Sequence, residues 1–178
     1  MTDGDLDRIE AAIGIVLPTA YRKLVVPFPV PAYVGNSDSE LWDDADRLVE
    51  LNRELRAGMT FLHPWPAHMF CMGRDQSGSC SAIDLQDPAC PVWWADRGHL
   101  DAVGSGQTSP SLPEWAGPYV ADLRSDLEGN GIDPDGPPAA REQAAQASAR
   151  AGCQFILALI GVSVVLVFVV WVLLKWLL

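Results

Sequence analysis

Residues 68–98 read HMFCMGRDQSGSCSAIDLQDPACPVWWADRG, and this stretch decides the fold. It contains three short runs of strand-forming residues, which begin at Met69, Cys80 and Pro91. The run from Cys80 to Leu85 alternates with a period of two, which is typical of a strand. Two turns separate the runs, because Gly supplies positive φ and Asp and Ser bond their own backbone. The stretch therefore predicts an antiparallel meander that needs a helix or a second sheet over its apolar face.

Apolar residues recur at helical spacing on both sides of this meander, in four segments. The first begins after Thr2 or Asp3, either of which can cap a helix, and ends at Gly14. The second has Pro18 in its first turn, and the fourth, residues 113–127, has large apolar side chains four residues apart. The third ends at Gly58, and its apolar stripe consists of Leu41, Leu48, Leu51 and Leu55.

The remaining segments are distinguished by composition. Residues 59–62 favour a short strand, and residues 99–111, rich in Gly and Ser, favour a loop. Residues 131–153 hold almost no large apolar side chain, so burial cannot offset their ordering entropy, and we expect a linker. The sequence thus predicts an α+β fold over residues 1–130, with N-terminal helices, a small, mostly antiparallel sheet and a closing helix.

The C-terminal residues 154–178 are expected to form one transmembrane helix. Residues 155–174 carry no charge, and 20 residues at about 1.5 Å each span about 30 Å, the thickness of a bilayer core. The alternative, a buried core helix, is seldom apolar on every side. Arg141 and Arg150 favour a cytoplasmic location for the preceding domain in a single-pass cell-membrane protein, although this bias leaves the opposite orientation open. The residues expected to contact the bilayer or its interface are Phe155, Leu166, Trp171, Lys175 and Trp176.

Several short patterns resemble the SUKH superfamily, which contains the yeast Smi/Knr cell-wall regulators and many bacterial immunity proteins. The central stretch has a Gly-x-Asp-x-x-Gly turn at residues 73–78, then Ile-Asp-Leu, then Pro-Val and aromatic residues. Residues 10–22 read EAAIGIVLPTAYR and are similar to the N-terminal motif of that superfamily. The resemblance covers residues 6–128, but the proline-rich residues 27–31 replace the Asn-Gly turn of many members. Two generic amphipathic helices are the alternative interpretation of the N-terminal motif.

Charge limits the class of partner. The chain has a formal net charge of −11, and residues 1–150 hold all 23 acidic residues. Such a surface repels phosphate backbones, which argues against nucleic acid as a partner. It attracts basic proteins and accelerates their association. The N-terminus has no apolar run, so we expect no secretory signal and hence free thiols at the four cysteines.

No motif indicates an enzyme, a cofactor site or a metal site. Gly73 and Gly78 have the spacing of a P-loop, but the lysine that binds phosphate is missing. No Gly-x-Ser-x-Gly motif occurs. Cys71, Cys80 and Cys90 are nine and ten residues apart, whereas zinc ligands usually lie within two to four residues of each other. We therefore expect no catalytic, cofactor-binding or metal-binding residue.

The remaining function is protein binding. Trp93 and Trp94 are consecutive in a strand and face opposite ways, so one of them is a candidate for an exposed interface, although burial under a loop fits equally. Acidic residues near the start of the third helix would supply the negative charge that attracts a basic partner. The candidate partner-binding residues are Glu40, Trp42, Asp43, Asp44, Asp46, Trp65 and Trp94. The resemblance implies an immunity protein that occludes the active site of a cognate basic toxin. The alternative is a membrane-tethered scaffold or regulator of cell-envelope synthesis. The oligomeric state stays open.

Overall fold

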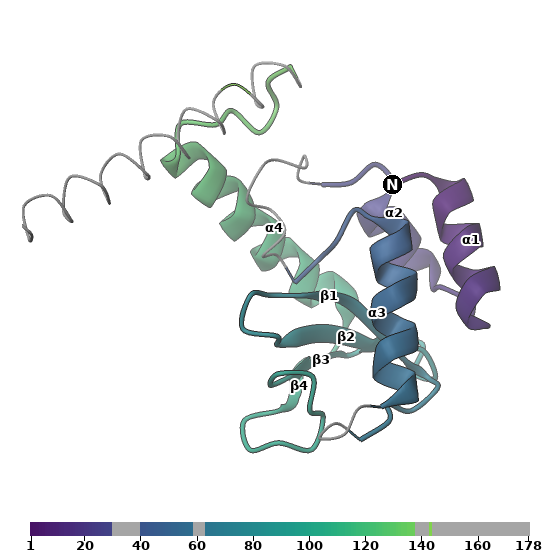
Figure 1. Cartoon of the computed structure of the whole chain (residues 1–178). Coiled ribbons are helices and arrows are strands. Elements are labelled where there is room, and N and C mark those ends of the chain that lie inside the picture. Colours follow the sequence, from purple (N-terminus) through teal and green to yellow (C-terminus); the bar gives the residue numbers. More distant parts are fainter. Residues whose placement is uncertain (30–39, 59–62, 138–142, 144–178) are drawn as a thin grey trace, which may run out of the picture. The chain divides into compact units, whose positions relative to one another are not determined.

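The structure is a computed structural model that describes residues 1–29, 40–58, 63–137 and 143. It is α+β, as predicted, and its four described helices and one four-stranded antiparallel sheet appear in Figure 1. The elements are α1 (Asp3–Ile13), α2 (Thr19–Val25), α3 (Ala45–Ala57), β1 (Met69–Arg74), β2 (Cys80–Asp84), β3 (Val92–Ala95), β4 (Gly106–Ser109) and α4 (Leu112–Gly129). The compact unit that carries the sheet comprises Met1–Asp126.

Three predicted elements involve residues that are not described. The strand expected at residues 59–62 and the transmembrane helix expected at residues 154–178 lie outside the described residues. Of the expected linker, residues 131–137 and 143 are described. Among the described residues, no helix is both long enough and apolar enough to cross a membrane.

The three strands of the predicted meander are confirmed, and they pair in sequence order. Asp75 holds the first turn, because its Oδ1 accepts hydrogen bonds from the Ser79 N–H at 2.8 Å and the Ser77 hydroxyl at 2.7 Å. Gly78 in this turn has a φ of 89°, which explains the need for glycine. The Gly-x-Asp-x-x-Gly pattern thus forms a hairpin turn.

A fourth strand, β4, pairs with β3 within the segment that we expected to be a loop. Its residues, Gly106 to Ser109, are polar or small and show neither alternation nor β-branched apolar side chains. They become a strand because the backbones of Trp93 and Trp94 supply a pairing edge. The expectation of a continuous loop over residues 99–111 was therefore wrong.

Helices α1 and α3 run parallel to each other. Met1, just before α1, pairs with Asp43, just before α3; Arg8 in the middle of α1 pairs with Asp46 in the first turn of α3. The carbonyl oxygen of Ala12 near the end of α1 accepts from Arg53 at 2.9 Å. The expected caps of α1 are confirmed: Thr2 forms a capping box with Asp5, and Gly14 ends the helix in the left-handed conformation. Both helix N-termini therefore lie at the same end of the molecule.

Helix α3 starts four residues later than the stripe of leucines predicted. Asp44 is the N-cap and accepts from the Arg47 N–H at 3.0 Å. Leu41 and Trp42 lie before the helix, and the Trp42 N–H donates to the carbonyl oxygen of Met72 at 3.0 Å. The segment before α3 thus contacts the edge strand β1, which is why the helix cannot begin at Leu41.

The side chain of Asn52 joins α3 to β1. Its Nδ2 donates to the carbonyl oxygens of Leu48 and Cys71, each at 2.9 Å, and its Oδ1 accepts from the Cys71 N–H at 2.8 Å. Asn52 is 1% exposed. The side chain therefore satisfies both backbone groups of a buried edge-strand residue, as buried polar groups require.

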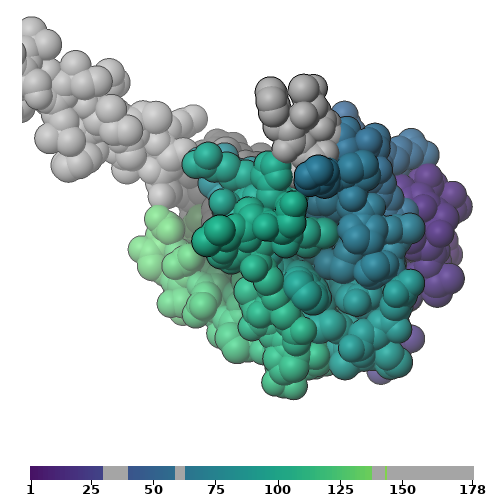
Figure 2. Space-filling model, turned by 90° about the horizontal axis from the view of Figure 1, so that it is seen from below, coloured from purple at the N-terminus to yellow at the C-terminus, as the bar shows by residue number. Residues whose placement is uncertain are grey.

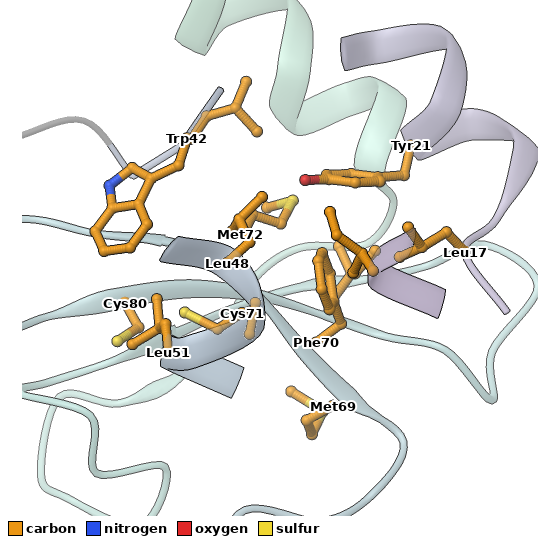
Figure 3. Packing of buried hydrophobic residues seen from close by; sticks show 14 of the residues in the cluster. Leu17, Tyr21, Trp42, Leu48, Leu51, Met69, Phe70, Cys71, Met72 and Cys80 are labelled. Atoms are coloured by element: carbon orange, nitrogen blue, oxygen red, sulfur yellow. The ribbon is translucent and has the colours of Figure 1, made fainter. Parts of the chain in front are cut away.

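The sheet lies between helices on its two sides. Figure 1 shows α3 in front of the strands and α4 behind them, with α1 next to α3. In Figure 2, seen from below, the teal of the strands lies between the blue of α3 and the green of α4. On the α3 side, Leu51 packs near Cys71 and Cys80 (Figure 3). The ring of Tyr21 from α2 meets Phe70 edge-on at a centroid distance of 5.3 Å. This core fixes the positions of the surfaces that are described next.

Candidate partner-binding surfaces

The common N-terminal end of α1 and α3 gathers acidic residues, which is where the positive ends of two helix dipoles favour them. We call this surface the acidic end, and it consists of Asp3, Asp5, Asp43, Asp44 and Asp46. The side chain of Asp46 is 81% exposed and that of Asp3 is 74% exposed. Both carboxylates are therefore presented to solvent from ordered helices.

The three predicted aspartates of this surface also have partners within the chain. Asp43 pairs with the amino group of Met1, Asp44 caps α3, and Asp46 pairs with Arg8. Arg8 also contacts Asp5 at 2.9 Å. The hydrogen bonds from Thr2 are the main cause of the lowered pKa of Asp5. Solvent screens exposed ion pairs, so these pairs hold the carboxylates only weakly.

A second arginine joins α2 to the acidic face of α1. Arg22 contacts Glu10 at 2.7 Å, Asp7 at 2.9 Å and Asp3 at 3.6 Å. The hydrogen bond to Glu10 is the largest cause of the raised pKa of this guanidinium. Three carboxylates share one arginine, so this face keeps an excess of negative charge.

Two of the predicted tryptophans are buried. Trp65 is 5% exposed, and its Nε1 donates to the carbonyl oxygen of Gly98 at 2.7 Å. Trp42 is 9% exposed, and the guanidinium of Arg47 lies 4.1 Å above its ring. Both were candidates for a partner-binding surface, and the structure instead packs their rings into the core. The Nε1 of Trp42 is buried without a hydrogen-bond partner.

Glu40 lies on the other side of the sheet and is half-buried. Its carboxylate accepts from the Ser81 hydroxyl, and its backbone N–H donates to the hydroxyl oxygen of Tyr119 at 2.9 Å. Burial is the main reason that the pKa of Glu40 is raised, and the negative charge of Asp75 adds to the rise, while the Ser81 hydrogen bond lowers it. The structure therefore does not bring Glu40 together with the acidic end.

Trp94 shares a face of the sheet with Ser81, because the two residues are directly paired across β2 and β3. Ser81 is the residue that donates to Glu40, so the pairing places two of the predicted residues on the α4 side. Trp93 and Trp94 are both partly exposed, and Trp93 packs against the core. Of the seven predicted residues, three aspartates belong to the acidic end, Trp42 and Trp65 are buried, and Glu40 and Trp94 belong to the α4 side.

A groove on the α4 side was not predicted. It has a volume of about 320 Å³ and lies between β4 and α4. We call it the β4–α4 groove, and its lining residues are Thr108, Ser109, Glu114, Trp115, Pro118, Tyr119 and Asp122. The rings of Trp115 and Tyr119 are stacked, with centroids 4.3 Å apart and planes 16° apart. The spacing of four residues between Trp115 and Tyr119 indicates from sequence that they share one face of a helix. The sequence of β4, which forms the other wall, gives no indication of a strand, so the groove could not be predicted.

The thiols of Cys71 and Cys80 lie side by side on adjacent strands and are fully buried. Burial raises the pKa of Cys71, whereas the hydrogen bond from the Cys71 thiol is the largest cause of a lowered pKa at Cys80. Reaction of a thiol needs access as well as thiolate character, and these side chains are closed to solvent. In the part of the chain that is described, no three His, Cys, Asp or Glu side chains gather as metal ligands would.

No known protein family, no curated protein and no solved structure matches this chain.

Proposed function

We propose that this chain is a membrane-anchored immunity protein that binds a basic protein toxin and occludes its active site. The observation that carries the proposal is the acidic end, where two parallel helices present ordered and exposed carboxylates. Complementary charge steers association and raises the rate at which partners meet. The excess of 23 acidic over 12 basic residues makes a basic partner the matching class.

A depression next to the acidic end supports the proposal. A shallow depression of about 570 Å³ follows the outer face of α3 and shares Asp46 with the acidic end. Its lining residues are Asp46, Val49, Glu50, Arg53, Glu54 and Ala57. Three acidic residues, one arginine and the small apolar side chains of Val49 and Ala57 line it, and such a mixture of charged and apolar groups suits a protein partner.

The SUKH-like sequence patterns of residues 6–128 support the same proposal, because that superfamily includes many immunity proteins. The apolar residues 155–174 act in it as a single-pass anchor that holds the acidic domain on the cytoplasmic side. Anchoring concentrates the domain at the membrane that an incoming toxin crosses. No enzymatic step by this chain and no bound cofactor is part of the proposal.

The test uses any toxin domain that is encoded next to the gene for this chain. We expect the full chain to bind it, to abolish its toxic activity at equal molar ratio, and to do so faster at low salt. Asp46→Lys should slow association about tenfold at low ionic strength, because it reverses an exposed charge at the acidic end. The matched control is Asp101→Lys, which makes the same change at an exposed site outside the acidic end. A toxin domain that the unaltered chain neither binds nor inhibits contradicts the proposal.

The predicted anchor also favours a second candidate, a membrane-tethered scaffold or regulator of cell-envelope synthesis. The yeast members of the resembled superfamily suggest this role. Neighbouring genes distinguish the two candidates: genes for toxins favour immunity, and genes for envelope synthesis favour regulation.

A further inference from the structure

We propose that the β4–α4 groove binds a lysine or arginine side chain of the basic partner, held between the Trp115–Tyr119 stack and the carboxylates of Glu114 and Asp122. This inference rests on the proposed function for the identity of the partner. The lining residues of the groove indicate a cation site, and α4, which carries most of them, lies on the opposite side of the sheet from α3.

The helical positions of the lining residues form two ridges. Glu114, Pro118 and Asp122 are each four residues apart, so they follow one line along α4. Trp115 and Tyr119 form the neighbouring line. A carboxylate therefore flanks the aromatic pair near each end, so a cation over the rings would also lie near two negative charges.

The aromatic pair is held in place before any ligand arrives. The stacked rings are 4.3 Å apart, and the Tyr119 hydroxyl oxygen accepts from the Glu40 N–H at 2.9 Å. This hydrogen bond fixes the far end of the Tyr119 ring. A planar guanidinium extends such a stack, and an ordered stack loses little side-chain entropy on binding.

One carboxylate and one carbonyl group are also ordered. The Glu114 carboxylate accepts from the Ser111 hydroxyl at 3.1 Å, at the start of α4. Pro118 has no N–H, so the carbonyl oxygen of Glu114 lacks its usual donor four residues on. Together with Asp122, these groups supply acceptors for the N–H groups of a cation, and they supply no positive charge that competes with it.

The binding test uses the full chain in detergent micelles, labelled with 5-fluorotryptophan. The chain has 7 tryptophans, and Trp115→Phe serves to assign the fluorine signal of Trp115. The probe is the peptide acetyl-Gly-Arg-Gly-amide, and its citrulline counterpart is the matched uncharged control. We expect a saturable shift of the Trp115 signal with the arginine peptide, and about three- to tenfold weaker binding in Asp122→Asn.

Asp101→Asn, at an exposed position outside both surfaces, should bind the arginine peptide as the unaltered chain does. The absence of a Trp115 shift at tens of millimolar peptide, or an equal shift with the citrulline peptide, overturns the groove as a cation site. The toxin assay separates this inference from the proposed function. Equal affinity of the toxin for the unaltered chain and for Asp122→Asn overturns the groove as a contact, while the proposed function stands. Charge-dependent peptide binding without any toxin binding leaves the cation site in place and removes the proposed function.

Discussion

At the scale of single residues, Gly73 allows the segment before α3 to pack directly against the edge strand β1. A Cβ atom at this position would lie 2.6 Å from the carbonyl carbon of Glu40, 2.7 Å from its oxygen and 2.9 Å from the Leu41 nitrogen. All three are backbone atoms, so they cannot rotate away as a side chain can. The segment before α3 therefore crosses β1 at a distance that only glycine permits.

We predict that Gly73→Ala destabilises the chain by about 1–3 kcal/mol, which is typical of overpacking in a close-packed interior. Urea unfolding of the full chain measures this change. The matched control is Gly117→Ala in α4, where a Cβ meets no atom within 4 Å. That change should stabilise by about 0.5–1 kcal/mol, because alanine is the better helix former. Equal effects of the two substitutions would refute the close approach at Gly73.

The raised pKa of Glu40 makes the free energy of unfolding depend on pH. Because burial raises its pKa in the folded state, the folded chain binds more protons than the unfolded chain between the two pKa values. This carboxyl therefore contributes stability at acid pH, below its unfolded pKa, and the contribution is lost as the pH rises through the folded pKa.

Glu40→Gln tests that dependence, because the amide oxygen still accepts from the Ser81 hydroxyl. We expect the variant to gain stability over the unaltered chain as the pH rises from about 4 to 7. Thermal unfolding at a series of pH values measures the difference, and Asp101→Asn, at an exposed position, controls for the loss of one charge. A variant that instead loses relative stability toward neutral pH would show that the pKa of Glu40 is lowered.

At the scale of elements, Asn52 is the main polar link between α3 and β1. We predict that Asn52→Leu, which is similar in size, costs about 2–4 kcal/mol, because the buried N–H and C=O of Cys71 lose their partners. The exposed Gln86→Leu should change the unfolding free energy by less than about 0.5 kcal/mol. Urea unfolding compares the two. An Asn52→Leu chain as stable as the unaltered one would mean that other groups satisfy Cys71.

Local sequence signals predicted the helices and strands that are determined by residues close to each other in the chain. Thr2 and Gly14 bound α1 as expected, and the period-two pattern from Cys80 found β2. β4 was missed because its four polar or small residues become a strand only against the backbones of Trp93 and Trp94. Leu41 was assigned to α3 because leucine spacing alone does not reveal contact with a distant strand.

The candidate surfaces, like the elements, could be predicted from sequence only where neighbouring residues determine them. The gathering of acids at one end follows from local N-terminal preferences, although only the parallel packing of α1 and α3 joins the two helices. Trp65 looked exposed between two prolines, but its indole donates to Gly98, 33 residues away. The β4–α4 groove needs both a missed strand and a helix, so no single stretch of sequence reveals it. Tertiary contacts therefore decide which aromatic residues are core and which line a groove.

At the scale of the whole molecule, the acidic residues and the predicted membrane anchor occupy separate parts of the sequence. All 23 acidic residues precede residue 151, and the apolar residues 155–174 follow them. Under the proposed function, recognition therefore belongs to the sheet-bearing unit, Met1–Asp126, and localisation belongs to the C-terminal segment. Removal of the C-terminal segment should leave recognition of the partner unchanged.

A pull-down from membranes tests whether recognition and anchoring are separate, with the full chain and a chain that ends at Gly131 compared as baits. The account predicts that one basic protein, a secreted toxin domain, is captured by both, and that its capture weakens steeply between about 50 and 200 mM salt as exposed charges are screened. Asp46→Lys should reduce its capture by both baits, whereas Asp101→Lys should not. Capture of envelope-synthesis proteins by the full chain alone, with no basic partner on either bait, would contradict the account and would make the C-terminal segment itself the element that binds.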